Sequence, residues 1–139
     1  MRYIRICRIA GGALVFIIGV VLSFAGAQLW ARGSAAAPDI IASDLVVRGS
    51  AYALIIMAVL LIVSGIATLR RVPWGSSVAA VAVIILVTAA FAGNYLLFGD
   101  IRILHTGTNV IGAVIILALL RAGSSHSNTG SSHAATRRT

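Results

Sequence analysis

Four long runs of apolar residues divide this chain, and short polar or charged segments separate them. Each run reaches the roughly 20 residues that a helix needs to cross a bilayer. The runs cover about residues 9–30, 51–69, 77–98 and 103–120. The pattern predicts an all-α integral membrane bundle of four antiparallel transmembrane helices within residues 1–121. Residues 122–139 are too polar to bury a core, and we expect them to form a disordered cytoplasmic tail.

The segments between the runs predict how the chain turns. Residues 32–50 form the longest connection, and Ser43 or Asp44 is suited to begin the helix that leads into the second run. The apolar residues of this connection predict that it lies against the membrane surface or the outer end of the bundle. Residues 72–75 and 99–100 are tight-turn sequences, and the second is so short that the third and fourth helices are expected to be antiparallel neighbours.

The first run carries small residues at a regular spacing. Gly12, Gly19 and Gly26 recur every seven residues, with Ser23 nearby. Such a stripe allows a second helix to approach closely, and close packing drives helix association in lipid. The basic start and the small residues up to Ala27 also fit a signal peptide that is cleaved after Ala27. Of these two interpretations, the packing stripe favours a retained helix.

Composition supports a membrane location. Apolar residues make up 60% of the chain and charged residues 10%, whereas about a quarter of the residues in a soluble domain are charged. The net charge of +8 comes from arginines that flank the apolar runs. Because these arginines form no patch with interleaved aromatic residues, nucleic-acid binding is not expected. The absence of Lys and Glu hints at a high-GC bacterial genome, so we expect a bacterial inner-membrane protein.

The distribution of charge predicts the orientation of the bundle. When the runs are threaded alternately, eight arginines and no acid fall on one side, and three arginines share the other side with all three aspartates. Short arginine-rich segments face the cytoplasm, so both termini are expected inside the cell. The arginines of the helical domain that set this topology are Arg2, Arg5, Arg8, Arg70, Arg71 and Arg121.

Polar side chains gather at the predicted external ends of the helices. The cluster comprises Gln28, Arg48, Tyr52, Asn94, Tyr95, Asp100, Arg102, His105 and Asn109. His105 and Asn109 are four residues apart and share a helix face. One interpretation is contact with a quinone, a lipid headgroup or a small solute. The other is structural: Asn94 would hydrogen-bond between helices, and His105 would be solvated or paired.

The chain contains no recognisable catalytic or metal-binding motif. No Asp, Glu, Lys or Arg lies inside any run, which argues against a proton-coupled transporter with a buried carboxylate and against an intramembrane aspartyl protease. No phosphate loop, nucleophile–base pair or metal-ligand spacing occurs. We therefore expect no enzymatic activity and no metal, and a quinone is the one cofactor that the polar cluster suggests.

One part of the sequence resembles a known family. The segments 26–30 (Gly-Ala-Gln-Leu-Trp), 49–52 (Gly-Ser-Ala-Tyr) and Arg70-Arg71 with Trp74 are similar to the transmembrane anchor region, or small membrane subunit, of membrane-bound pyrroloquinoline-quinone-dependent sugar and polyol dehydrogenases. The chain departs from that family in an insertion at residues 33–48, in Ala53 at the place of a second tyrosine, and in residues 94–100. The resemblance implies a subunit that docks a periplasmic dehydrogenase near the quinone pool.

These observations favour a non-catalytic accessory or anchoring subunit of a larger membrane complex. Its small-residue faces would bind the helices of a membrane-protein partner or of a second copy of the chain. The alternative is a binding or transport module that acts through the external polar cluster.

Overall fold

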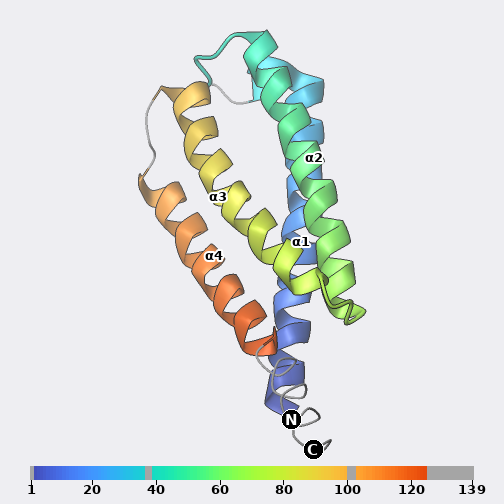
Figure 1. Ribbon diagram of the computed structural model, residues 1–139. Coiled ribbons are helices and arrows are strands. Elements are labelled where there is room, and N and C mark those ends of the chain that lie inside the picture. Colours follow the sequence, from blue (N-terminus) through green and yellow to red (C-terminus); the bar gives the residue numbers. More distant parts are fainter. Residues whose placement is uncertain (1, 37–38, 100–102, 125–139) are drawn as a thin grey trace, which may run out of the picture.

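In the computed structural model, the chain is a bundle of four long helices (Figure 1). The structure describes residues 2–36, 39–99 and 103–124, without the side chains of Arg2 and of residues 103–106, and this part of the chain contains no strand. The helices are α1 (Arg2–Arg32), η1 (Gly33–Ala36, a 3-10 helix), α2 (Asp44–Leu69), α3 (Gly75–Phe98) and α4 (Ile103–Ser124). All four α-helices have segments long and apolar enough to cross a membrane, which confirms the predicted all-helical class.

The helices extend beyond the predicted apolar runs. α1 begins at Arg2 and α2 at Asp44, where Ser43 is the N-cap residue but makes no side-chain capping hydrogen bond. A helix longer than the hydrocarbon layer continues into the headgroup region, where charged residues are tolerated. α4 continues through Ser124, so the first three residues of the predicted tail are helical. The remainder of the predicted tail lies outside the described residues.

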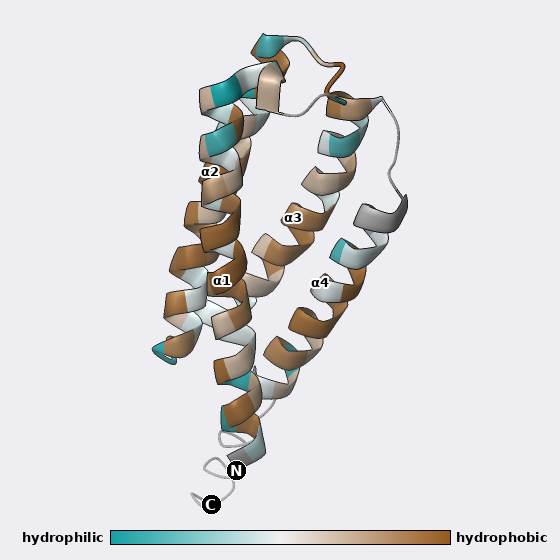
Figure 2. Ribbon diagram, turned by 180° about the vertical axis from the view of Figure 1, so that it is seen from behind, coloured by the Kyte–Doolittle hydropathy of each residue, from teal (hydrophilic) through white to brown (hydrophobic). Residues whose placement is uncertain are grey.

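Polar residues collect at the two ends of the bundle, and apolar residues dominate between them (Figure 2). We call one end the arginine-rich end; its described charged residues are Arg5, Arg8, Arg70, Arg71 and Arg121. The opposite end holds Arg32, Asp39, Asp44 and Arg48. The connections between successive helices alternate between these two ends (Figure 1). The two groups of charges are therefore separated by the apolar middle of the helices.

α1 and α2 pack closely along a line of small residues. Three glycines of α1 meet three small residues of α2, in the pairs Gly12–Gly65, Gly19–Ala58 and Gly26–Ala51. A Cβ atom added to the α1 glycine of each pair would lie 3.0–3.3 Å from the carbonyl oxygen of its α2 partner. The pairs recur every seven residues on both helices and follow one another in opposite chain order. The α1 glycines thus lie where α1 and α2 approach each other closely, and we call this line the α1–α2 seam.

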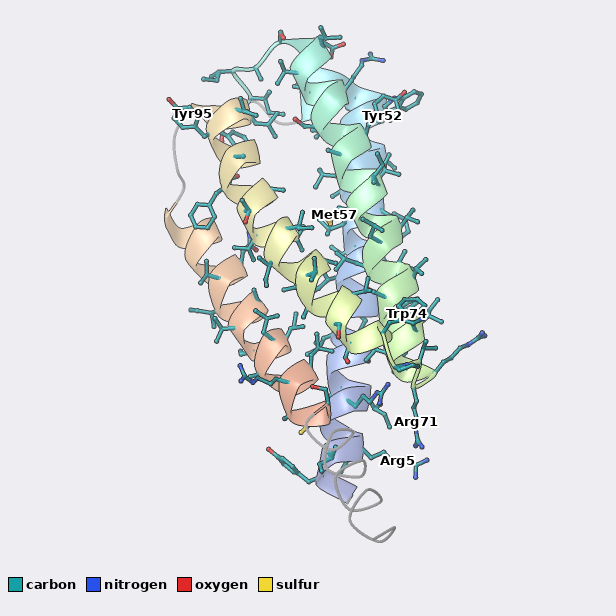
Figure 3. The ribbon with its side chains drawn as sticks, viewed as in Figure 1. Arg5, Tyr52, Met57, Arg71, Trp74 and Tyr95 are labelled. Atoms are coloured by element: carbon teal, nitrogen blue, oxygen red, sulfur yellow. The ribbon has the colours of Figure 1, made fainter. Side chains whose placement is uncertain are left out.

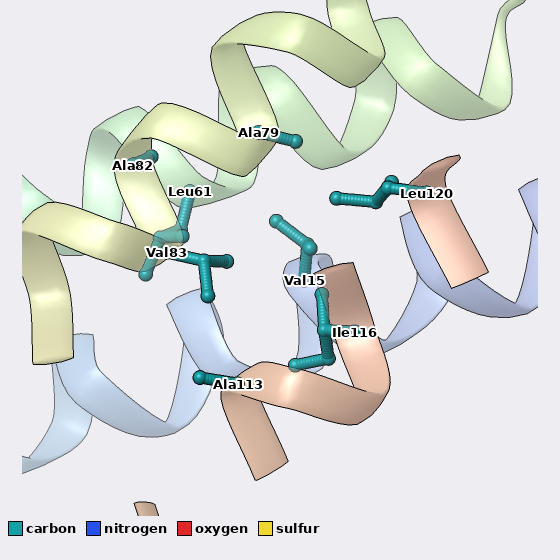
Figure 4. Close-up of a cluster of buried hydrophobic side chains, with 8 residues drawn as sticks. All are labelled: Val15, Leu61, Ala79, Ala82, Val83, Ala113, Ile116 and Leu120. Carbon is teal, nitrogen blue, oxygen red and sulfur yellow. The ribbon is translucent and has the colours of Figure 1, made fainter. Parts of the chain in front are cut away.

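The buried core lies toward the arginine-rich end. Its eight buried side chains come from all four helices (Figure 4): Val15, Leu61, Ala79, Ala82, Val83, Ala113, Ile116 and Leu120. On α3 the buried residues all lie between Gly75 and Val83, and on α4 none of residues 107–112 is buried. The α1–α2 pair, in contrast, buries residues toward the opposite end as well, including Val47 and Ala51. α3 and α4 therefore join this pair mainly through the halves nearest the arginine-rich end.

The connection between α1 and α2 touches the end of α3. The backbone N–H of Ile41 donates a hydrogen bond to the carbonyl oxygen of Leu97 at 3.0 Å. Gly99 has a positive φ of 67°, and a Cβ atom there would lie 2.6 Å from Cδ1 of Ile41. The connection therefore lies against this end of the bundle, one of the two placements that its apolar residues predict.

The α1–α2 seam predicts that Gly19→Ala destabilises the protein. The new methyl group would lie 2.8 Å from Cγ1 of Ile62 and 3.0 Å from two backbone atoms, which leaves it no room. We expect the free energy of unfolding, measured by titration with sodium dodecyl sulfate in mixed micelles, to fall by about 1–3 kcal/mol.

Gly112→Ala is the matched control, because a Cβ atom at Gly112 has no neighbour within 4 Å. Alanine has the higher helix propensity, so this variant should be neutral or up to about 1 kcal/mol more stable. Equal effects of the two substitutions would contradict the packing role of the seam.

Candidate functional site

The structure divides the predicted external cluster into separate groups. Trp30 and Tyr52 form an edge-to-face ring pair, with centroids 6.5 Å apart and planes at 72°. Nε of Arg48 donates to the Asp44 carboxylate at 2.8 Å, and the backbone N–H of Ser34 donates to the other carboxylate oxygen of Asp44 at 3.1 Å. The ring pair joins the end of α1 to the start of α2, and the Ser34 hydrogen bond joins η1 to α2. The Arg48–Asp44 ion pair lies within α2. The described contacts of both groups are therefore structural.

The other predicted residues do not gather around Tyr52. Tyr95 is exposed on α3 and points away from the bundle on the side opposite Tyr52 (Figure 3). Gln28 and Asn109 are exposed on α1 and α4, and Asn94 is half-buried on α3. Asp100 and Arg102 lie outside the described residues, as does the side chain of His105. A quinone, solute or headgroup site at this end therefore stays a prediction.

The arginine-rich end brings functional groups from all four helices together. Arg8 of α1 reaches the end of α2, where its Nε donates to the carbonyl oxygen of Thr68 at 3.2 Å. An Nη atom of Arg8 donates to the carbonyl oxygen of Val72, also at 3.2 Å. The last carbonyls of a helix lack partners within the helix and carry partial negative charge. Each of these oxygens also accepts a backbone hydrogen bond, Thr68 from the N–H of Arg71 and Val72 from that of Gly75. Arg8 therefore adds a second donor and a positive charge at the end of α2 and in the turn after it.

The turn after α2 holds Arg71 in an unusual backbone conformation. The N–H of Val72 donates to the carbonyl oxygen of Ala67 and the N–H of Arg71 to that of Thr68, which is the hydrogen-bond pattern of a Schellman motif. Arg71 occupies the position in this motif that glycine normally takes, with φ of 61°. A left-handed conformation costs a residue with a side chain roughly 1 kcal/mol. The turn therefore keeps an arginine where glycine would fit better.

The close approach of α2 and α3 depends on Gly75. A Cβ atom at Gly75 would lie 2.7 Å from the carbonyl carbon of Ala67 and from the backbone nitrogen of Thr68. Because these are backbone atoms, the helices could not accept a side chain at Gly75 without moving apart. Gly75 thereby places the first turn of α3, with Ser76 and Ser77, beside the end of α2.

An open cavity of about 600 Å³ lies among these elements. Its polar lining consists of Arg5, Arg8, Thr68, Arg71, Ser76, Ser77 and Ser124. Arg5 and Arg71 extend toward the same region from α1 and from the turn (Figure 3). A smaller neighbouring hollow of about 360 Å³ shares the three serines and adds Arg121. We call the larger space the arginine cavity; its donors and positive charge suit an anion.

The same surroundings offer no metal site. Among the described residues, no three His, Cys, Asp or Glu side chains lie close enough together to hold a metal ion. The arginine cavity presents guanidinium groups and hydroxyls, and guanidinium groups repel cations and donate hydrogen bonds without accepting any. The chemistry that this end supports is binding of a negatively charged group.

The contacts of Arg8 predict a cost for removing its guanidinium group. Arg8→Met keeps much of the side-chain length but leaves the carbonyl oxygens of Thr68 and Val72 without this donor. We expect the free energy of unfolding in detergent to fall by about 1–3 kcal/mol. Arg70→Met, at an exposed neighbouring arginine, is the control. A loss for Arg8→Met no larger than that of the control would show that the capping contacts carry no stability.

Comparisons with known proteins do not assign the chain to a family. No protein-family model, no curated protein and no solved structure matches it. The features of the chain that bear on its function are the α1–α2 seam, the uneven burial of α3 and α4, and the arginine cavity.

Proposed function

We propose that this chain is a non-catalytic accessory or anchoring subunit of a larger complex in the bacterial inner membrane. The observation that supports this proposal is that parts of α3 and α4 are not covered by other described residues of the chain. We call residues 84–98 and 103–112 the outer halves of these helices; none of the side chains described there is buried. In a complex, the transmembrane helices of a partner would cover them.

The small residues of the outer halves support this role. A Cβ atom added at Gly93, Gly107 or Gly112 would have no neighbouring atom within 4 Å. The glycines of the α1–α2 seam, by comparison, are already in contact with α2. Helices associate in lipid where small residues let their backbones approach, and the described structure leaves open space beside these three glycines.

Asn109 supplies a polar group on the same surface. It lies four residues before Ala113 and seven before Ile116, so it continues the face of α4 that is buried nearer the arginine-rich end. The Asn109 side chain is nevertheless exposed. A side-chain amide within a membrane helix is stabilised by a hydrogen bond to a neighbouring helix, worth on the order of 1 kcal/mol. A partner helix with a polar group at this depth would provide one.

The orientation that we propose places the arginine-rich end and both termini in the cytoplasm. Its support is the positive-inside rule, because the described acids Asp39 and Asp44 share the opposite end with Arg32 and Arg48. The outer halves of α3 and α4 would then lie in the periplasmic half of the bilayer. One form of this role is the anchor of a periplasmic dehydrogenase, as the resemblance in the sequence implies.

Extraction of the full chain from its own membrane in a mild detergent tests this proposal. We expect the chain to co-purify with a larger membrane protein in a fixed ratio, determined by quantitative mass spectrometry. Gly107→Leu and Gly112→Leu should reduce the recovery of that partner by about fivefold, the effect of losing roughly 1 kcal/mol of helix packing.

Gly49→Leu is the matched control, because Gly49 also has open space around it but lies on α2. It should leave the recovery of the partner unchanged. Purification of the wild-type chain as a monomer or as a homo-oligomer alone would contradict the accessory role. If Gly49→Leu reduced the recovery of the partner as much as the α4 substitutions do, the outer halves of α3 and α4 would not be the binding surface.

A further inference from the structure

The described residues that line the arginine cavity carry excess positive charge. Three arginines line it, and none of its described lining residues is acidic. Arg8 offsets the partial negative charge at the end of α2, so the excess comes from Arg5 and Arg71. The described acids, Asp39 and Asp44, lie at the opposite end of the bundle (Figure 1). An anion that enters the cavity meets no negative side chain from these residues.

Backbone and hydroxyl donors add to this charge. Ser76 and Ser77 belong to the first turn of α3, which contains no acidic residue, and its N-cap residue Trp74 makes no side-chain capping hydrogen bond. The N–H groups of a first helical turn attract anions because they point out of the helix and carry partial positive charge. Ser76 and Ser77 line the cavity together with arginines from α1 and from the turn after α2. The donors therefore come from three elements that the fold brings together.

Arg8 is held in place by hydrogen bonds, whereas Arg5 and Arg71 are exposed. The two hydrogen bonds of Arg8 fix its guanidinium plane and leave further N–H groups of its five for another acceptor. Arg71 keeps its position in the Schellman turn despite a left-handed backbone, which glycine would occupy at lower cost. Strain of this kind, retained in a turn that lines a cavity, points to a role for the side chain.

The size and surroundings of the cavity indicate which anion it takes. Its volume of about 600 Å³ is that of a site for an organic ligand and exceeds what one inorganic ion fills. Ile4, Ile9 and Leu69 add apolar atoms to the lining. The cavity lies at one end of the apolar middle of the bundle (Figure 2), where a helix that spans a bilayer meets the headgroup region. Basic pockets between transmembrane helices hold the headgroups of acidic lipids. The apolar residues would contact the glycerol and the first acyl carbons.

We propose that the arginine cavity is a phosphate site that binds the headgroup of an anionic phospholipid from the surrounding leaflet. The phosphate oxygens accept hydrogen bonds from Arg5, Arg71 and the start of α3, and Arg8 forms the fixed inner wall. This site is independent of the accessory role, since it lies at the end of the bundle away from the outer halves of α3 and α4. It also differs from the headgroup contact predicted at the opposite end.

Native mass spectrometry of the full chain with equimolar phosphatidylglycerol and phosphatidylcholine tests the proposal. We expect a retained phosphatidylglycerol adduct in preference to phosphatidylcholine. Arg71→Gly should weaken phosphatidylglycerol binding by about tenfold, as expected for the loss of a charge-assisted hydrogen bond. Glycine suits the backbone at this position, so the variant should stay folded, which the thermal melting of its helices checks.

Two controls separate this site from general attraction between arginine and acidic lipid. Arg70→Gly removes an equal charge from the adjacent residue, which does not line the cavity, and should leave the adduct unchanged. Millimolar inorganic phosphate or glycerol 3-phosphate should not displace the lipid.

Three results would overturn the proposal. Equal retention of the two lipids would show that the cavity does not select for a negative headgroup. If Arg70→Gly weakened phosphatidylglycerol binding as much as Arg71→Gly does, the net charge of the chain would explain the binding without the cavity. If glycerol 3-phosphate displaced phosphatidylglycerol at comparable concentration, the phosphate group that the site binds would belong to a soluble ligand and not to a lipid.

Discussion

Close contact between the backbones of α1 and α2 is the constraint on which the rest of the bundle depends. Lipid chains are as apolar as leucine, so the hydrophobic effect does not draw transmembrane helices together, and packing at short range has to do so. Glycine at positions 12, 19 and 26 lets α1 reach the carbonyl oxygens of α2 at three successive levels. The resulting pair is buried toward both ends of the bundle. It provides the fixed surface to which α3 and α4 are added.

The arrangement at the arginine-rich end follows from this pair. Because α1 and α2 are in register along the seam, Arg8 of α1 lies beside the last turn of α2 and donates to the carbonyl oxygens of Thr68 and Val72. The Schellman turn and Gly75 then return the chain so that α3 starts against α2. Gly123 brings the end of α4 to the backbone of Arg8, since a Cβ atom there would lie 2.8–3.1 Å from atoms of Arg8. Four helix ends meet in this way around the arginine cavity.

Periodicity and charge in the sequence predict much of the fold. The glycine spacing indicates the packing face of α1, and the same seven-residue spacing of Ala51, Ala58 and Gly65 was available to identify its partner face on α2. The site at the arginine-rich end is harder to predict, because an arginine at the end of an apolar run looks the same whether it faces water or caps another helix. Arg8 reaches the end of α2 because of the register of α1 on α2, and Arg71 reaches the cavity because of the conformation of one turn. The residues next to each arginine in the sequence indicate neither the register nor the turn conformation.

The central claim is the register of the α1–α2 seam, and thiol cross-linking between the two helices tests it most directly. In a Cys7→Ala background, which removes the native buried thiol, Trp30→Cys and Tyr52→Cys would be combined and treated with a short bifunctional thiol reagent in membranes. Both residues are exposed and their rings lie 6.5 Å apart near the Gly26–Ala51 pair, so the glycines of the seam stay in place. The seam predicts efficient intramolecular cross-linking of this pair and none between Trp30→Cys and Leu69→Cys. Cross-linking of the second pair, with none in the first, would contradict the register and the account built on it.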